Sequence, residues 1–66
     1  MQLIVNDEPV MVETEVTLDD LLEQLGYAKE SVAVAMDGEF VPRSAYATVT
    51  LQAGQALDIV SPMQGG

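Results

Sequence analysis

The sequence lacks the side chains on which most enzymes and metal sites depend. Its 66 residues include no cysteine and no histidine, and the only basic residues are Lys29 and Arg43. Without cysteine the chain forms no disulfide and offers no thiolate to zinc or to a substrate. Without histidine, a serine or threonine nucleophile would need Lys29 or a carboxylate as its base, and no motif supports such a pair. These absences argue against an enzyme and against a metal site.

Positive charge is scarce as well. Eleven acidic residues against two basic ones give a net charge of −9. Phosphate contacts need clustered lysine or arginine, so the composition argues against a nucleic acid partner and against an anionic membrane surface. No apolar run is long enough to span a bilayer, and the first residues lack the basic segment of a signal peptide. We therefore expect a cytoplasmic protein whose partners are other proteins.

Several short segments are rich in β-forming residues and are separated by polar turns. The expected strands cover residues 1–5, 10–13, 32–36, 39–41 and 56–60. Residues 48–51 also have strand propensity, although their pattern is weak. Alternation along the first strand places Met1, Leu3 and Val5 in the core and leaves Ile4 exposed or facing a partner. The same alternation directs Leu57 inward.

The clearest local pattern predicts a helix over residues 17–26. Thr17 is a capping residue, and Asp20, three positions later, completes a capping box. Gly26 is a natural end because glycine adopts the left-handed conformation without a steric clash. Leucines recur at helical spacing and form one apolar stripe, at Leu18, Leu21, Leu22 and Leu25. A single helix must bury this stripe against one face of a sheet, so the order ββαβββ predicts a two-layer α+β domain.

Gly65 and Gly66 are the remaining feature that suggests chemistry. Two residues without side chains let the backbone enter a narrow channel and approach the walls of an active site closely. The six residues after Val60 reach at most roughly 20 Å, at about 3.4 Å each. We therefore interpret residues 1–60 as a folded domain and residues 61–66 as a flexible tail that carries a terminal carboxylate into a partner's active site.

A terminal carboxylate needs activation before it can react. It is ionised at neutral pH, which makes it a poor electrophile. The simplest activation is an anhydride formed with ATP on a partner enzyme, after which a nucleophile displaces the nucleotide. A sulfur nucleophile yields a thiocarboxylate, as in a sulfur carrier, whereas a lysine yields an isopeptide bond, as in a protein modifier. A passive interaction domain with an unreactive end is the third alternative.

The order of elements and several motifs resemble the ubiquitin-like β-grasp proteins, and within them the ThiS family of sulfur carriers. The matching segments are Val5-Asn6, Thr17-Leu18, Leu21-Leu22, Val32-Ala33-Val34, Val41-Pro42-Arg43-Ser44, Leu51 with Gly54, Ile59-Val60 and Gly65-Gly66. The Val-Pro-Arg-Ser segment is the most discriminating of these. Asn6-Asp7 departs from the usual Asn-Gly turn, and residues 60–63 also resemble the sulfur carrier of molybdenum-cofactor synthesis. Molybdopterin sulfur transfer therefore remains an alternative pathway.

The resemblance implies a β-grasp fold, with a mixed sheet of four to five strands on one helix. It also implies a protein co-substrate and not an enzyme. An E1-like adenylyltransferase resembling ThiF would adenylate Gly66, with Gly65 as a thin linker. A sulfur donor protein would then supply the sulfur of the thiocarboxylate. The activating enzyme would consume the ATP, and no cofactor is expected to stay bound to the chain.

The resemblance further implies delivery of the sulfur to a thiazole synthase resembling ThiG, for thiazole formation in thiamine biosynthesis. Docking should use the uncovered sheet face and the final strand. The expected partner-binding residues are Ile4, Val60 and Met63. Arg43 either pairs with an acidic group of a partner or anchors the turn in which it lies.

Overall fold

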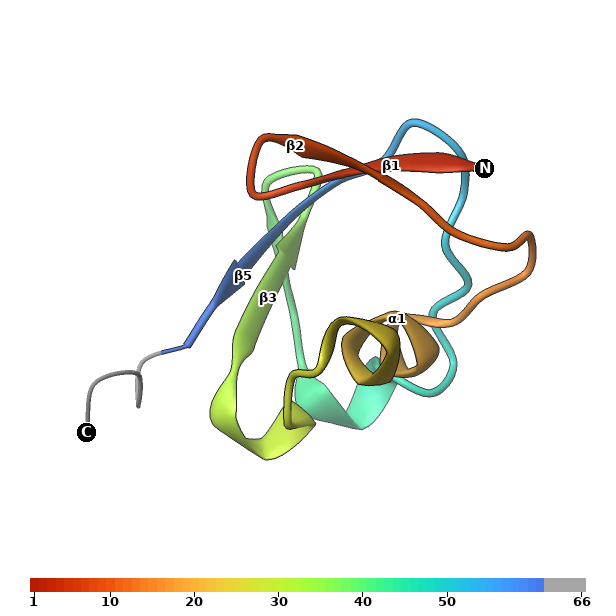
Figure 1. Ribbon diagram of the computed structural model, residues 1–66. Helices are drawn as coiled ribbons and strands as arrows, with labels where there is room; N and C mark the ends of the chain where they lie inside the picture. The colour runs from red at the N-terminus through yellow and green to blue at the C-terminus, as the bar shows by residue number, and fades with distance from the viewer. Residues whose placement is uncertain (62–66) are drawn as a thin grey trace.

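The computed structural model describes residues 1–61 and places one helix across one face of a five-stranded sheet (Figure 1). The strands are β1 (Gln2–Val5), β2 (Glu8–Met11), β3 (Ala33–Met36), β4 (Glu39–Val41) and β5 (Ala56–Val60), and the helix is α1 (Leu18–Leu25). Two short 3₁₀ helices, η1 (Lys29–Ser31) and η2 (Arg43–Ala45), lie in the connections. The strand order is β2-β1-β5-β3-β4, with β1 and β5 parallel and the other neighbours antiparallel. The predicted order ββαβββ and the predicted mixed sheet are confirmed.

Each of the two hairpins turns on a pair of residues with left-handed backbone. The φ angles are 51° at Asn6 and 68° at Asp7 in the first turn, and 51° at Asp37 and 87° at Gly38 in the second. A type I′ turn requires positive φ at both central positions, and asparagine, aspartate and glycine adopt it most readily. The two turns therefore fix the registers of both hairpins.

The second strand starts earlier than the sequence pattern predicts. It covers Glu8–Met11 and not residues 10–13, because the preceding turn takes only two residues. Pro9 is tolerated there because β2 is an edge strand. Pro9 faces Ile4, whose N–H donates to the Gln55 carbonyl at 2.9 Å, on the side away from β2. The pairing at this position therefore needs no N–H from the proline.

Helix α1 begins and ends as predicted. The Thr17 hydroxyl accepts a hydrogen bond from Asp20 N–H at 3.1 Å, and the Asp20 carboxylate accepts one from Thr17 N–H at 3.3 Å. These two bonds form the capping box. Gly26 ends the helix with a φ of 86°, in the left-handed region.

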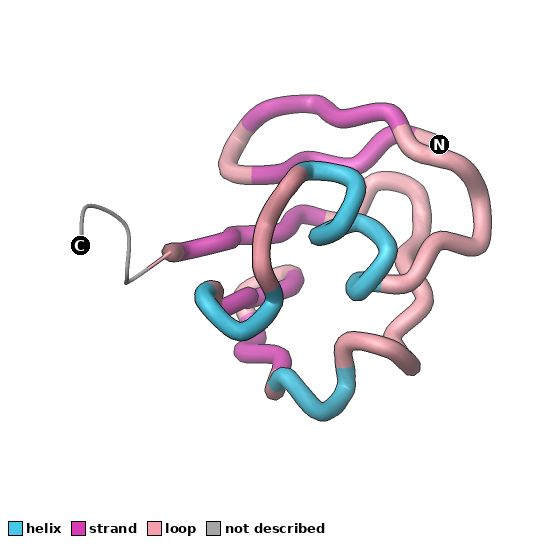
Figure 2. The backbone as a smooth tube through the Cα atoms, turned by 60° about the horizontal axis from the view of Figure 1, so that its bottom comes forward, coloured by secondary structure: helices cyan, strands magenta, loops and turns pink. Residues whose placement is uncertain are grey.

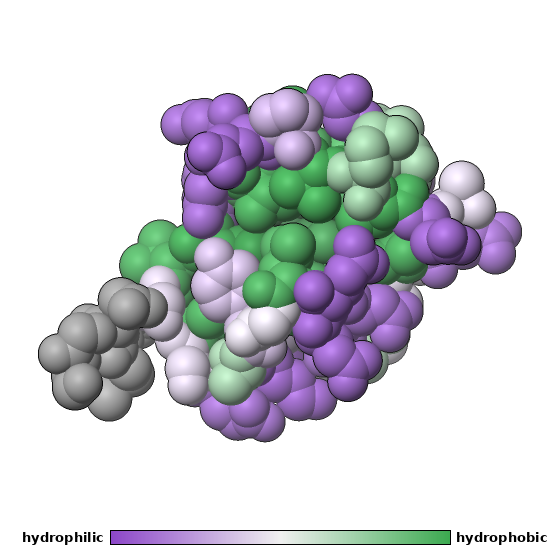
Figure 3. All heavy atoms as spheres, viewed as in Figure 1, coloured by the Kyte–Doolittle hydropathy of each residue, from purple (hydrophilic) through white to green (hydrophobic). Residues whose placement is uncertain are grey.

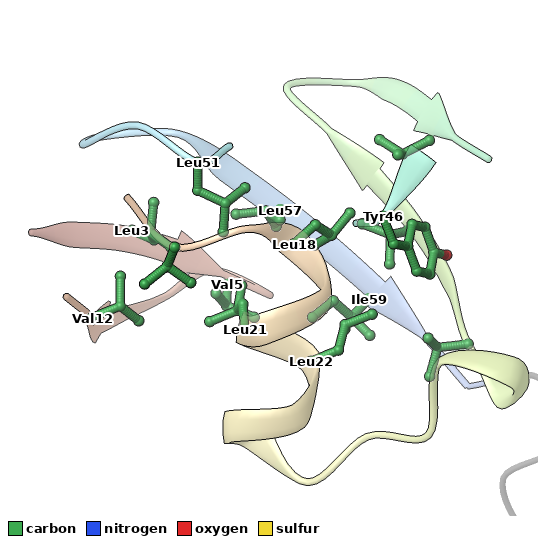
Figure 4. Packing of buried hydrophobic residues seen from close by; sticks show 14 residues of the cluster. Leu3, Val5, Val12, Leu18, Leu21, Leu22, Tyr46, Leu51, Leu57 and Ile59 are labelled. Atoms are coloured by element: carbon green, nitrogen blue, oxygen red, sulfur yellow. The ribbon is translucent and has the colours of Figure 1, made fainter. Parts of the chain in front are cut away.

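The hydrophobic core lies between α1 and the sheet face that the helix covers (Figure 4). The helix contributes its leucine stripe, and the strands contribute alternate residues. The buried side chains of these elements are Leu18, Leu21, Leu22, Leu3, Val5, Val34, Val41, Leu57 and Ile59. Leu25, the last leucine of the stripe, is only partly buried. The predicted core positions Leu3, Val5 and Leu57 are confirmed, whereas Met1, also predicted in the core, is only partly buried and packs against it.

Residues 48–51 do not form a strand. They lie in a loop that makes one isolated β-bridge, from Thr50 to Thr17. The loop also supplies an acceptor at the start of α1, where Leu18 N–H donates to the Val49 carbonyl at 2.9 Å. The first N–H groups of a helix have no partner within the helix, so this connection stabilises the end of α1 that the capping box serves.

Candidate docking face

The sheet face opposite α1 is the candidate functional site, and we call it the open face. Its members follow from the strand register, because residues directly opposite each other on neighbouring strands point to the same side. Ile4 of β1 is opposite Pro9 of β2 and Ala56 of β5. Asp58 and Val60 follow Ala56 at two-residue steps along β5 and therefore share its side. In Figure 2, α1 lies across the strands on the other side of the sheet.

Strands β3 and β4 complete this surface. Ala33 is opposite Val60, and Ala35 is opposite both Asp58 of β5 and Phe40 of β4. The open face comprises Gln2, Ile4, Pro9, Met11, Ala33, Ala35, Phe40, Ala56, Asp58 and Val60. Its side chains are apolar except for one amide and one carboxylate.

The large apolar side chains of the open face are highly exposed. Met11, Phe40 and Val60 expose 68%, 71% and 58% of their surfaces. Within residues 1–61 these three are the large hydrophobic residues with such exposure, and all of them lie on this one face. Scattered exposed apolar residues are ordinary, but a group of them on one uncovered face marks a surface that binds another molecule.

Two of the predicted partner-binding residues, Ile4 and Val60, lie on the open face. Their contact with a partner stays a prediction. The third, Met63, lies outside the described residues, and so do the two predicted reactive residues, Gly65 and Gly66. The structure therefore describes the candidate docking surface and the strand that precedes residues 61–66.

Met11 and Phe40 were not predicted as partner-facing residues, although the sequence holds a signal for each. Met11 stands between Val10 and Val12 in an alternating segment, so it points away from them. For Phe40 the signal is the two-residue turn at Asp37 and Gly38, because a hairpin with this turn pairs Phe40 with Ala35. The exposure of these two side chains could not be predicted from the sequence, because it depends on α1 covering only one side of the sheet.

The last strand is held in place by the side chain of Asn6. Its amide nitrogen donates to the Ile59 carbonyl at 3.2 Å, and its amide oxygen accepts from Ile59 N–H at 2.8 Å. The side chain thereby extends the pairing of β1 and β5 beyond the point where the β1 backbone turns away. This clamp fixes the position of Val60, the last residue of β5 and a member of the open face.

We expect Asn6→Gly to lower the free energy of unfolding by about 1–2 kcal/mol, because two hydrogen bonds to Ile59 are lost. Glycine keeps the positive φ of this position accessible. Asp7→Gly is the matched control, since Asp7 also has positive φ and forms no side-chain hydrogen bond in residues 1–61. Urea unfolding followed by circular dichroism measures both changes. An equal loss in the two variants would assign the effect to backbone entropy.

Arg43 ties the two short 3₁₀ helices together. Its Nε donates to the Lys29 carbonyl at 3.2 Å, and one terminal nitrogen donates to the Glu30 carbonyl at 3.1 Å. The predicted anchoring role is therefore confirmed. Arg43 also lines a hollow together with Phe40 and Ala33, two members of the open face. The predicted ion pair with a partner stays a prediction.

The described part of the chain was predicted to hold no metal site and no membrane-spanning segment. Within residues 1–61 no group of three or more acidic, histidine or cysteine side chains lies close enough to share a metal ion. None of the helices in this part has the length and apolar character that crossing a membrane requires. Figure 3 shows hydrophobic side chains in the middle of the molecule, with hydrophilic ones around them.

A mixed five-stranded sheet on one helix, with an uncovered apolar face beside the end of the central strand, defines a ubiquitin-like β-grasp protein. The chain belongs to the ThiS family, whose family model matches residues 2–66. The crystal structure of the thiamine biosynthesis protein ThiS from Geobacter metallireducens is similar, with a TM-score of 0.85 and 33% identity over the whole of both chains. The sulfur carrier protein ThiS of Escherichia coli is 30% identical over 66 residues, again the whole of both chains.

Two thiazole synthases contain a segment that is similar to this chain. They come from Paramagnetospirillum magneticum and Magnetococcus marinus, and each is 38% identical over 66 residues. The match covers all of this chain but 20% of each synthase. The chain thus spans about a fifth of the length of these relatives.

Proposed function

We propose that this protein is a sulfur carrier of thiamine biosynthesis and that Gly66 is the residue that carries the sulfur. The observation that supports this most strongly is the family match over residues 2–66, which includes Gly65 and Gly66. A carrier needs a body that docks on its partners and a thin end that enters their active sites. The open face suits the first requirement, and the glycine pair suits the second.

The proposed chemistry begins at the carboxylate of Gly66. One carboxylate oxygen attacks the α-phosphorus of ATP on an adenylating enzyme, and pyrophosphate leaves. Hydrosulfide released by a donor protein then attacks the carbonyl carbon of the acyl adenylate. The carbon–oxygen bond to the phosphate breaks, AMP leaves, and a thiocarboxylate remains. The carrier is a co-substrate in both steps, because its partners supply the nucleotide site and the catalytic groups.

The thiocarboxylate next gives its sulfur to a thiazole synthase. The two synthases that contain a segment like this chain support such a partner. Docking through the open face would leave residues 61–66, which follow the central strand, to enter the synthase. This division of roles fits the placement of the exposed large apolar residues, which lie on β2, β4 and β5 and not on α1.

The mass of the intact protein tests the proposal. The chain is incubated with ATP, the adenylating enzyme and the sulfur donor encoded in the same genome. We expect its mass to rise by the difference between a sulfur and an oxygen atom, and to return to the starting value when the thiazole synthase and its substrates are added. Larger conjugates would indicate a protein modifier. Sulfur transfer to a molybdopterin precursor, with none to the thiazole synthase, would indicate the other carrier pathway.

A further inference from the structure

Asp58 is the one charged side chain on the open face, and it lies at the centre of that face. β5 is the middle strand of the sheet, and Asp58 is the middle residue of β5. Ala56 and Val60 on its own strand and Ala35 directly opposite on β3 are apolar, and on the β1 side the Asn6 amide is bonded to the backbone of Ile59. The carboxylate is exposed and forms no ion pair within residues 1–61.

The chain itself offers no cation to this carboxylate. Its two basic residues are Lys29 and Arg43. Lys29 lies 3.7 Å from the carboxylate of Asp19, and Arg43 donates to backbone carbonyls. Water solvates Asp58 while the face is open, but a partner that covers the face removes this water. Burying a lone carboxylate among apolar groups is strongly unfavourable, so a wholly apolar partner surface would be rejected.

We propose that the thiazole synthase presents a lysine or arginine side chain to Asp58 and that this contact selects the correct partner among those with an apolar docking surface. The inference rests on the proposed function. The occupant is a thiazole synthase because two such enzymes hold, within one polypeptide, a segment matching this whole chain. Such linkage gives the two parts a high effective concentration for each other.

The contact acts mainly on specificity. When the apolar residues around Asp58 exclude water, the attraction between the carboxylate and the partner's cation strengthens. A wrong partner that lacks the cation leaves Asp58 unpaired and binds weakly. Met11, Phe40 and Val60 would then supply most of the apolar area buried on binding. Asp58 would determine which partner surface binds.

The decisive variant is Asp58→Leu, because it weakens binding to a partner surface with a basic residue and strengthens binding to an apolar partner surface. A basic residue facing position 58 is left unpaired by leucine, whereas an apolar surface gains a contact. We expect Asp58→Leu and Asp58→Asn each to bind the thiazole synthase of the same genome at least about tenfold more weakly than the parent. Titration calorimetry measures the affinity, and circular dichroism verifies folding. Glu23→Gln is the matched control, since Glu23 is exposed on α1, across the molecule from the open face.

Binding of Asp58→Leu as tight as that of the parent, or tighter, would overturn this inference. The proposed function would still stand if the parent chain bound the synthase and formed the thiocarboxylate. An equal loss in Glu23→Gln would also overturn it, because net charge would then be the cause. A loss confined to the adenylating enzyme would assign Asp58 to that partner and contradict the inference as stated. A parent chain that neither binds the synthase nor gains sulfur would overturn both the inference and the proposed function.

Discussion

Deletion of Gly66 is expected to reduce thiocarboxylate formation by about 100-fold or more, because a misplacement of only 1 Å at a reacting atom can cost that much. The shortened chain still ends in a glycine carboxylate. Its end, however, lies about 3.4 Å short of the position that the adenylating enzyme is built to meet. The initial rate of pyrophosphate release and the mass of the product measure the loss.

Gly66→Ala is the matched variant, because it keeps the length of the tail and adds one methyl group. The loss of thiocarboxylate formation in Gly66→Ala reports how narrow the channel of the adenylating enzyme is. The loss in the deletion variant reports how far the tail must reach. Both variants should keep the circular dichroism spectrum and the unfolding midpoint of the parent, since the core consists of residues before position 60. Undiminished sulfur transfer by the deletion variant would show that Gly66 is not the reactive residue.

The helix could be predicted in detail because its signals are local. Thr17, Asp20 and Gly26 act within one turn of the helix ends, and each does what its side chain or its backbone freedom favours. The leucine stripe needed only one partner surface, and the surrounding strands supplied it. The same holds for the second hairpin, where Asp37 and Gly38 suit the turn on their own.

The start of β2 and the conformation of residues 48–51 depend on contacts between distant segments. Pro9 fits within β2 only because this strand lies at the sheet edge beside β1. Residues 48–51 have strand propensity, yet their backbone groups are used at the start of α1 by contacts such as the one between Leu18 and Val49. In both places tertiary context decided between local options of similar energy.

The candidate site was predictable by elimination and by alternation. In a chain without cysteine or histidine the terminal carboxylate is the candidate reactive group, and alternation in β1 and β5 places Ile4 and Val60 outside the core. Neither argument predicts that Phe40 and Met11 are exposed. Their exposure follows from the absence of a covering element on their side of the sheet in residues 1–61. Composition and spacing also do not distinguish one sulfur pathway from another, for which the relatives were needed.

The topology fits the proposed division between a docking surface and a delivery arm. The strand that ends the domain is also the central strand of the sheet, so its last residue lies at the margin of the open face. A partner that covers this face is therefore close to the start of the tail. The parallel pairing of β1 and β5 and the Asn6 clamp hold that starting point fixed.

Leu21→Ala is expected to destabilise the domain by about 2–5 kcal/mol, the usual cost of removing a buried leucine side chain from a core. Leu21 is 0% exposed and packs between the helix and the sheet. A chain of this length has a total stability of roughly 3–10 kcal/mol, at about 0.05–0.15 kcal/mol per residue. The substitution therefore removes a large share of the stability, and urea unfolding measures it.

Leu25→Ala is the control for this change, with the same residue type in the same helix at a partly buried position. Its cost should be about 1 kcal/mol, because less apolar area is lost from contact with the core. Sulfur transfer by the two variants should follow their folded fractions, since the open face exists only when α1 holds the other side of the sheet. If Leu21→Ala were largely unfolded and still accepted sulfur at the parental rate, the folded domain would be dispensable. The tail alone would then be the substrate.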